Sequence, residues 1–252
     1  MRRNLSKQRL GEGKSALGTM VNAASPLVAE FLGHCGYDFI VVDLQHGENS
    51  LHSVSTMLQA LSSTPATPVV RVPANIPMYI QRVLDLGAFG IIVPMVNTRA
   101  EAEAVAASVR YAPKGARSWG PVRGAIYGGA DYFSKAADEL LTLVMLESVE
   151  ALRNAREILG VDGVDGCFVG PADLNITLGY SPESPDLGAP TEAGIAAILK
   201  IAQEAGKVAG IHAVSIDDAR RRVAQGFRFV TIMADIRMMK VVATQALAAV
   251  RA

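Results

Sequence analysis

The chain has 252 residues, half of them apolar, which is enough for one large domain with a buried core or for two small domains. Lysine plus arginine and aspartate plus glutamate number 24 each, so no concentrated basic face for nucleic acid is expected. No apolar run approaches the roughly 18 residues of a membrane span, and the basic start lacks the apolar stretch of a signal peptide. These features argue against nucleic-acid and membrane partners and favour a small-molecule substrate.

Only two cysteines occur, Cys35 and Cys167. Cys35 follows a helical pattern, whereas Cys167 lies in an apolar run that is typical of a strand. Two buried free thiols are therefore expected in place of a disulfide, as in a protein of the reducing cytoplasm.

Short apolar runs rich in β-branched residues recur along the chain and indicate eight strands. In chain order the predicted strands are Ala16–Met20, Phe39–Val42, Pro68–Val72, Gly90–Val93, Leu141–Leu146, Gly166–Val169, Val208–Ile211 and Phe229–Met233. Between most of them lie stretches of helical length whose apolar residues are three or four positions apart. Strands that are apolar throughout and alternate with helices predict a parallel sheet covered by helices.

Eight strand–helix units in a chain of this length match a closed (β/α)8 TIM barrel, so we expect one barrel domain over residues 1–252. A doubly wound open sheet is the alternative, but no Gly-x-Gly-x-x-Gly turn follows the first strand. The two longest irregular stretches, Pro113–Asp131 and Tyr180–Thr191, are predicted to be loops over the active site. The run Arg220–Arg222 is interpreted as a solvent-facing helix surface.

Polar residues follow the apolar runs at the carboxyl ends of the strands, where the chemistry of such a barrel takes place. Acidic, basic and imidazole groups are therefore expected to meet at one rim. In chain order these rim residues are Asp43, Gln45, His46, Arg71, Glu147, Asp173, His212 and Asp235.

Two carboxylates of this rim, Glu147 and Asp173, are candidate metal ligands. Because they have neither thiolates nor a two-histidine helical motif beside them, they suit a hard octahedral ion such as Mg²⁺ or Mn²⁺. The alternative for Glu147 is a residue of the first turn of a helix, where its charge is favourable to the helix dipole. Spacing alone does not decide between the two.

The other rim residues suggest how a substrate could be held. An arginine at the end of a strand, such as Arg71, is costly to bury unless it meets an anion, either a substrate or a structural partner. His46 lies on a glycine-flanked loop and could exchange a proton near neutrality, whereas His212 could also be a plain wall of the pocket. The segment Gly170–Asp173 leaves a strand and could bind a carboxylate with free backbone N–H groups, although Gly-Pro is also an ordinary turn.

Taken together, these motifs resemble the HpcH/HpaI family of class II pyruvate aldolases. The resemblance covers most of the chain, and its motifs occur in the family's order. They are Gly36–Phe39 with Asp43–Gly47, Val70–Pro73, Val93–Val96, Arg110–Pro113 with Gly115 and Arg117, Glu147–Ser148 and Gly170–Leu174.

The resemblance implies a metal-dependent aldolase that cleaves 4-hydroxy-2-keto acids to an aldehyde and pyruvate, or an analogue such as hydroxypyruvate. It implies that Glu147 and Asp173 hold a divalent ion, Mg²⁺, Mn²⁺ or Co²⁺. It also implies that the family's base, arginine and partner aspartate fall on His46, Arg71 and Asp85, with Asp85 reaching the site across a subunit contact.

Several details of the site follow from this chemistry. The backbone of Gly170, Pro171, Ala172 and Asp173 is expected to bind the keto-acid carboxylate. Gln45, near Asp43, stands where many relatives carry glutamate, and the lost negative charge bears on the metal preference and the proton shuttle.

The resemblance also implies a hexamer, a trimer of dimers, with an exchanged C-terminal helix. Met238–Val250 is apolar on nearly every side, as expected for a helix buried against another subunit. The pocket for the aldehyde is expected to involve Trp119, Arg123 and His212, with Tyr180, and Arg123 could bind an acceptor carboxylate or pair within the protein.

Three other functions fit the sequence less well. A Schiff-base aldolase needs a lysine inside the barrel, but Lys207 precedes a strand and Lys200 lies in a helix. A citrate-lyase-like carbon–carbon lyase acting on an acyl-CoA ester needs a basic groove, and only Arg117 and Arg123 are candidates for it. A catalytically silent binding module is disfavoured because the polar rim is complete.

Overall fold

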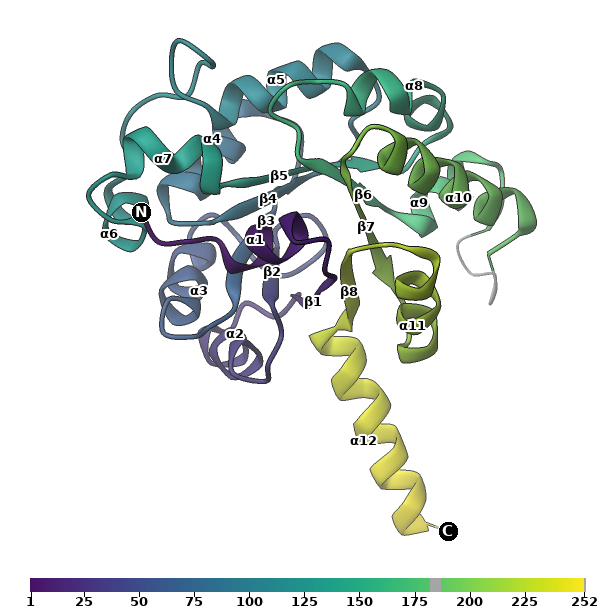
Figure 1. Cartoon of the computed structure of the whole chain (residues 1–252). Coiled ribbons are helices and arrows are strands. Elements are labelled where there is room, and N and C mark those ends of the chain that lie inside the picture. The colour runs from purple at the N-terminus through teal and green to yellow at the C-terminus, as the bar shows by residue number, and fades with distance from the viewer. Residues whose placement is uncertain (182–186, 252) are drawn as a thin grey trace.

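The apolar runs of the sequence become strands that are buried on both faces, because they lie between the barrel interior and a layer of helices. The computed structural model describes residues 1–181 and 187–251. Its strands are β1 (Ala16–Val21), β2 (Phe39–Asp43), β3 (Thr67–Arg71), β4 (Gly90–Val93), β5 (Leu141–Leu146), β6 (Gly166–Val169), β7 (Val208–Ala213) and β8 (Phe229–Ala234). They pair in parallel in the order β1 to β8, and β8 closes on β1 (Figure 1). The predicted closed barrel is confirmed.

The helices between the strands form the outer layer. They are α1 (Leu5–Gly11), α2 (Pro26–Gly33), α3 (Ser53–Leu61), α4 (Pro77–Asp85), α5 (Arg99–Val109), α6 (Val122–Gly128), α7 (Tyr132–Glu139), α8 (Val149–Leu159), α9 (Pro171–Thr177), α10 (Ala189–Glu204), α11 (Ile216–Gln225) and α12 (Asp235–Arg251). Serine caps begin several of them: Ser25 accepts from the Val28 N–H and Ser148 from the Ala151 N–H. Within 1–181 and 187–251, no helix is long and apolar enough to cross a membrane.

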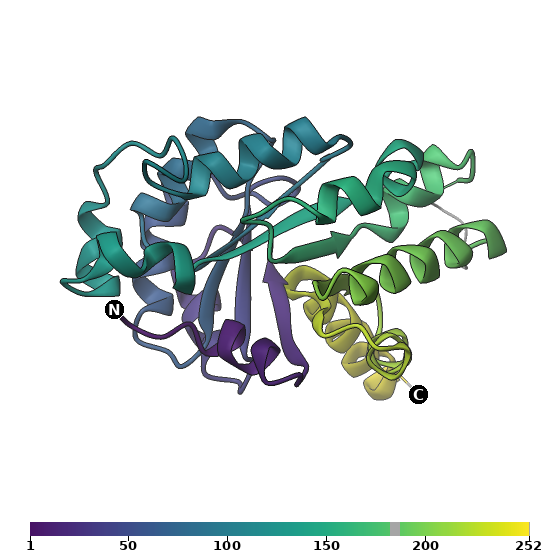
Figure 2. The ribbon, with the colours of Figure 1, turned by 45° about the horizontal axis from the view of Figure 1, so that its top comes forward.

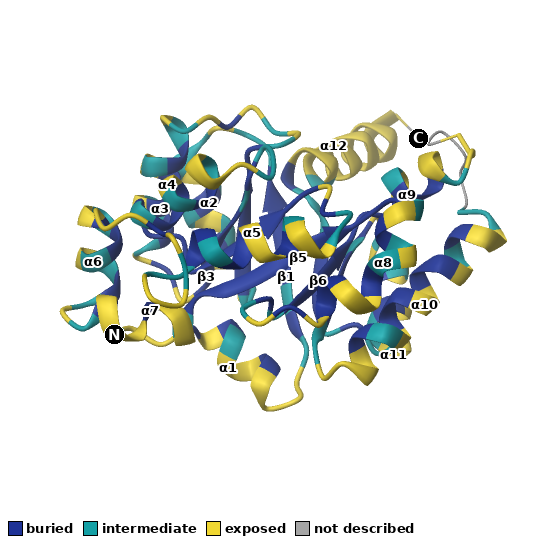
Figure 3. Ribbon diagram, turned by 90° about the horizontal axis from the view of Figure 1, so that it is seen from above, coloured by how far each residue is buried: buried dark blue, intermediate teal, exposed yellow. Residues whose placement is uncertain are grey.

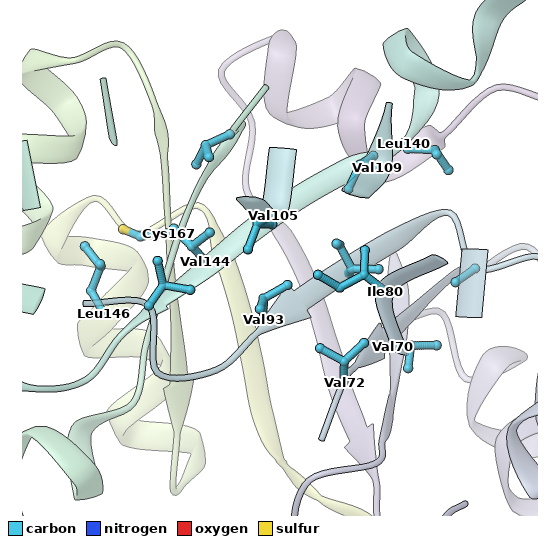
Figure 4. Packing of buried hydrophobic residues seen from close by; sticks show 14 of the residues in the cluster. Val70, Val72, Ile80, Val93, Val105, Val109, Leu140, Val144, Leu146 and Cys167 are labelled. Carbon is cyan, nitrogen blue, oxygen red and sulfur yellow. The ribbon is translucent and has the colours of Figure 1, made fainter. Parts of the chain in front are cut away.

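The core has two layers. Inside the barrel, the Phe39 ring of β2 stacks on the Phe229 ring of β8 with centroids 3.7 Å apart. A Cβ at Gly18 of β1 would collide with the Phe39 ring, so this position needs glycine. Between strands and helices a second apolar layer includes Val93, Val105 and Val144 (Figure 4). The dark blue strands of Figure 3 show how completely the two layers bury the sheet.

Helix α1 covers the end of the barrel at which the strands begin (Figure 2). Leu10 joins the inner cluster, and the Ser6 hydroxyl donates to the Asp38 carbonyl, just before β2. The Asn4 amide donates to the Phe89 carbonyl, just before β4. With this end closed, the opposite rim is the open one.

Three expectations from the sequence are wrong. Pro113–Asp131 is not a loop over the active site, because it contains α6, which packs against α4. Arg222 is not solvent-facing: its side chain is fully buried and paired with Glu192 and Asp218. Cys35 is an exposed thiol, although Cys167 is buried and both are free as expected. In each case local periodicity could not show which other element packs against the residue.

Helix α12 projects away from the barrel (Figure 1) and is exposed along most of its length (Figure 3). Several of its apolar side chains are exposed to solvent, among them Val242, 64% exposed, and Val250, 87% exposed. Together with α2 it lines an apolar groove of about 730 Å³.

Candidate active site

The register of neighbouring strands places the rim residues side by side. Asp43 and Arg71 are paired positions at the ends of β2 and β3. Leu146 of β5 pairs with Val169 of β6, so Glu147 and the Gly170–Asp173 segment leave the barrel together. The sequence-predicted convergence of these groups therefore follows from parallel pairing.

A cavity of about 500 Å³ opens at this rim, within the size range of small-molecule sites. Its wall is formed by Met20, Asn22, His46, Arg71, Met145, Phe168, Gly170, Pro171, Ala172, Asp173, Asn175, Leu187, His212, Val214, Asp218, Ala234 and Arg237. Of the predicted loop Tyr180–Thr191, Leu187 reaches the cavity, and residues 182–186 lie outside the described part of the chain.

Asp43 and Arg71 form a two-pronged ion pair in the floor of the site. Arg71 donates through Nε to Oδ1 at 2.8 Å and through Nη2 to Oδ2 at 2.6 Å. Asp43 is fully buried and also accepts from the backbone N–H groups of Gln45 and His46. Burial alone would raise the pKa of Asp43, but these bonds and the arginine charge hold it below its usual value. Arg71 keeps free donors for a ligand in the cavity.

Glu147 is buried next to Gly170, and only one of its two carboxylate oxygens has a hydrogen-bond partner. Its Oε1 accepts from the Met95 backbone N–H at 2.8 Å, and Met95 adopts an unusual φ of 54°. Its Oε2 is buried without a hydrogen-bond partner, and it occupies the space that a side chain at position 170 would need. Burial, aided by the negative charge of Asp173, raises the pKa of Glu147 to about 7.

These two carboxylates fit a divalent cation. An unpartnered buried carboxylate oxygen beside a second carboxylate is an incomplete site that a cation would neutralise. Asp173 lies in the first turn of α9 and in the cavity wall. Within residues 1–181 and 187–251 no group of three histidine, cysteine or acidic side chains is close enough to hold a metal. An ion held here would therefore take its other ligands from water and substrate.

Two histidines face the same cavity but differ in environment. His46 is exposed at the mouth of the site. His212 of β7 bonds through Nδ1 to the Thr231 hydroxyl, its register partner on β8, at 2.9 Å. Burial, together with the positive charge of Arg71, lowers the pKa of His212 to about 4, so this ring is neutral at pH 7.

Asp85 does not lie at this rim within the chain. It ends α4, near the barrel end at which the strands begin, and accepts from Arg117 Nη2 at 2.8 Å. The Arg117 side chain is fully buried, and its Nε and Nη1 have no hydrogen-bond partner. Among the described residues, Asp85 is thus the carboxylate that pairs with the buried Arg117, which gives it a structural role in the isolated chain.

The predicted acceptor residues Trp119 and Arg123 are also placed elsewhere, so within this chain that expectation is corrected. Trp119 packs edge-on against Tyr111, with centroids 5.3 Å apart, and does not line the cavity. The Arg123 guanidinium caps the Leu86 and Leu58 carbonyls. Of the four residues predicted for this pocket, Trp119, Arg123, Tyr180 and His212, only His212 lines the cavity.

Sequence reasoning missed several residues of the cavity wall. Asn22 follows β1 directly, donates to Asp43 at 3.4 Å and keeps a buried Oδ1 without a partner. The same strand-end rule that found Glu147 would have found Asn22. Asp218 and Arg237 come from α11 and α12, and no local signal marked them as part of the site.

A sequence model described as HpcH/HpaI aldolase/citrate lyase matches residues 17–240. The chain belongs to this family. Its membership confirms the resemblance seen in the motifs and the expectation of a carbon–carbon lyase.

Individual relatives are similar in sequence to this HpcH/HpaI chain over nearly its full length. It is 42% identical to a hydroxypyruvate/pyruvate aldolase of Rhizorhabdus wittichii, with 96% of each chain covered. It is 37% identical to a 4-hydroxy-2-oxo-heptane-1,7-dioate aldolase of Shigella sonnei, covering 94% of this chain and 90% of that one. A crystal structure of a family protein from Burkholderia cenocepacia J2315 superposes with a TM-score of 0.93 at 33% identity, covering 99% of this chain and all of the other.

Because the pKa of Glu147 is raised, we expect the stability of this protein without bound metal to depend on pH. Between pH 4.5 and 7 the folded state keeps a proton that the unfolded state has lost, so the free energy of unfolding falls as pH rises. We expect Glu147→Gln to be more stable than the parent by about 3 kcal/mol at pH 8 in EDTA, and equal to it below pH 4.5. Urea titrations at both pH values measure this, and an equal difference at both would contradict it.

Removing Asp85 should destabilise the fold. Asp85→Ala leaves Arg117 buried without its carboxylate, and we expect a loss of about 3 kcal/mol in the free energy of unfolding. The matched control is Asp162→Ala, because Asp162 is 93% exposed and its pair with Arg110 is screened by water, so a much smaller loss of stability is expected. Urea titration measures both losses. Equal losses in the two variants would show that the buried Asp85–Arg117 pair contributes no more to the free energy of unfolding than the exposed pair does.

Proposed function

We propose that this protein is a divalent-metal-dependent class II aldolase that reversibly cleaves 4-hydroxy-2-keto acids to pyruvate, or hydroxypyruvate, and an aldehyde. The observation that carries the proposal is the buried, unpartnered Oε2 of Glu147 beside Asp173, in a cavity that also holds Arg71 and His46. The named activities of the R. wittichii and S. sonnei relatives support it.

Glu147 and Asp173 would hold the ion, with Mg²⁺, Mn²⁺ and Co²⁺ as candidates. When bound, it supplies positive charge that polarises the 2-keto group of the substrate. The protein side chains and backbone of the site provide the remaining steps.

Arg71 stabilises the negative charge that develops on the enolate oxygen, and Asp43 holds its guanidinium in place. Gly170 and Pro171 lead into α9, and the free backbone N–H groups of Ala172 and Asp173 bind the substrate carboxylate. The helix dipole at this end also favours an anion.

In the cleavage direction His46 takes the proton of the 4-hydroxyl. The C3–C4 bond then breaks, its electron pair forms the enolate, and C4 leaves as the aldehyde. The enolate is protonated at C3 to give the keto acid. Synthesis runs through the same steps in reverse. Asp85 could join this site only from another subunit, because within the chain it lies at the other end of the barrel.

We further propose a homo-oligomer, a hexamer arranged as a trimer of dimers, in which α12 packs on a second copy. The apolar groove between α2 and α12, lined by Phe31 and Val242, is the surface that the second copy would cover. The free thiols Cys35 and Cys167 support our prediction of a cytoplasmic location.

The oligomer can be tested with two substitutions on α12. A charge in the groove, Val242→Asp, should convert the assembly to smaller species, whereas Lys240→Asp on the same helix but outside the groove should not. Light scattering after gel filtration gives the mass, which for a hexamer is six times 26.6 kDa. A parent protein of monomer mass would disprove the proposal.

The aldolase chemistry is tested first by deuterium exchange at C3 of pyruvate or hydroxypyruvate, followed by NMR in D₂O without any aldehyde. We expect exchange with Mn²⁺ or Mg²⁺ and none after metal removal. Replacing both Glu147 and Asp173 by alanine should lower the rate at least a hundredfold in a folded protein. Exchange that is independent of metal, or that survives the double substitution, would refute the mechanism.

A further inference from the structure

The cavity wall contains a second arginine, Arg237, in the first turn of α12. Arg71, the first, is paired with Asp43. Arg237 is exposed and, among the residues that the structure describes, has no ion pair or side-chain hydrogen bond. An arginine is charged at every physiological pH, so this wall presents a fixed positive charge to whatever enters.

Two acidic residues near Arg237, one in the same cavity wall and one in the same helix, are engaged elsewhere. Asp218, in the same wall, accepts from Arg221 Nη2 at 2.8 Å and from Arg222 Nε at 3.1 Å. Asp235, two residues before Arg237, is buried and accepts from the backbone N–H groups of Asn22 and Ala23. In the described part of the chain, neither carboxylate is available to neutralise Arg237.

The rest of this side of the cavity does not compete for an anion. His212 is neutral near pH 7 because burial, together with the charges of Arg71 and Arg237, lowers its pKa. Val214 and Leu187 add apolar wall. In the proposed function, the keto-acid carboxylate binds at the start of α9. The charge of Arg237 is therefore left for the other reactant.

We propose that Arg237 is a specificity-determining residue that binds an anionic group, carboxylate or phosphate, on the aldehyde acceptor. The inference rests on the proposed aldolase function and assigns the substrate class within it: aldehydes that carry an acidic group at the end away from the carbonyl. Guanidinium binds carboxylate and phosphate through paired charge-assisted hydrogen bonds, so both chemistries fit.

The test compares matched acceptors in the synthesis direction, with the donor and metal that support C3 exchange. Succinic semialdehyde is paired with butanal, and D-glyceraldehyde 3-phosphate with D-glyceraldehyde, so that each pair differs mainly in the acidic group. The parent protein is compared with Arg237→Met, with the charge-retaining Arg237→Lys, and with Arg251→Met, an exposed arginine at the far end of α12.

For at least one pair we expect the parent to prefer the anionic acceptor, and the pair that responds tells carboxylate from phosphate. Arg237→Met should lower the anionic-to-neutral ratio of kcat/KM ten- to a hundredfold, mainly through KM. Arg237→Lys should recover most of the ratio, and Arg251→Met should not change it. Added salt should raise KM for the anionic acceptor only.

The assignment is overturned if the parent shows no preference in either pair, or if Arg237→Met lowers kcat/KM equally for anionic and neutral acceptors. Deuterium exchange at C3 in the parent, without any aldehyde, distinguishes failure of the Arg237 proposal from failure of the proposed aldolase function. Exchange without anion preference refutes the role of Arg237 alone. Absence of metal-dependent exchange with either donor refutes the proposed function, and the role of Arg237 with it.

Discussion

The site depends on the fully buried carboxylate of Asp43. Both of its oxygens bond Arg71, and Oδ1 also anchors the backbone N–H groups of Gln45 and His46. A buried carboxylate is costly without such partners, so the guanidinium and the loop that carries the imidazole are held to one arrangement. The pair exists because β2 and β3 are in register at their last residues.

The part of the rim around Glu147 contrasts with the Asp43–Arg71 pair, because its carboxylate is only partly satisfied. Glu147 is as deeply buried as Asp43 but keeps one oxygen without a partner. A Met95 backbone of unusual φ supplies its single hydrogen bond, and the absence of a side chain at Gly170 makes room for it. One half of the rim is thus electrostatically complete, and the other is unsatisfied in a way that a cation would relieve.

The barrel could be predicted because apolar, β-branched runs of strand length report burial on both faces directly. The rim was predictable for the same reason: a polar residue that follows such a run must lie at the carboxyl end of a strand. Asn22 fits that rule as well as Glu147 does, because it directly follows β1. The prediction for Arg222 was wrong, and the two alternatives for Arg123 could not be separated, because a charge pattern on one helix does not reveal the carboxylates or carbonyls of the next.

The sequence by itself determined the order of strands and helices, the closed barrel and the residues that follow each strand. These properties depend on local periodicity and on the parallel register that it imposes. Only the tertiary structure decided that Asp85 pairs with Arg117 near the barrel end at which the strands begin, and that Arg237 faces the cavity. Those placements depend on how a loop returns across a helix and on where α12 leaves β8, and no short-range pattern encodes such long-range packing.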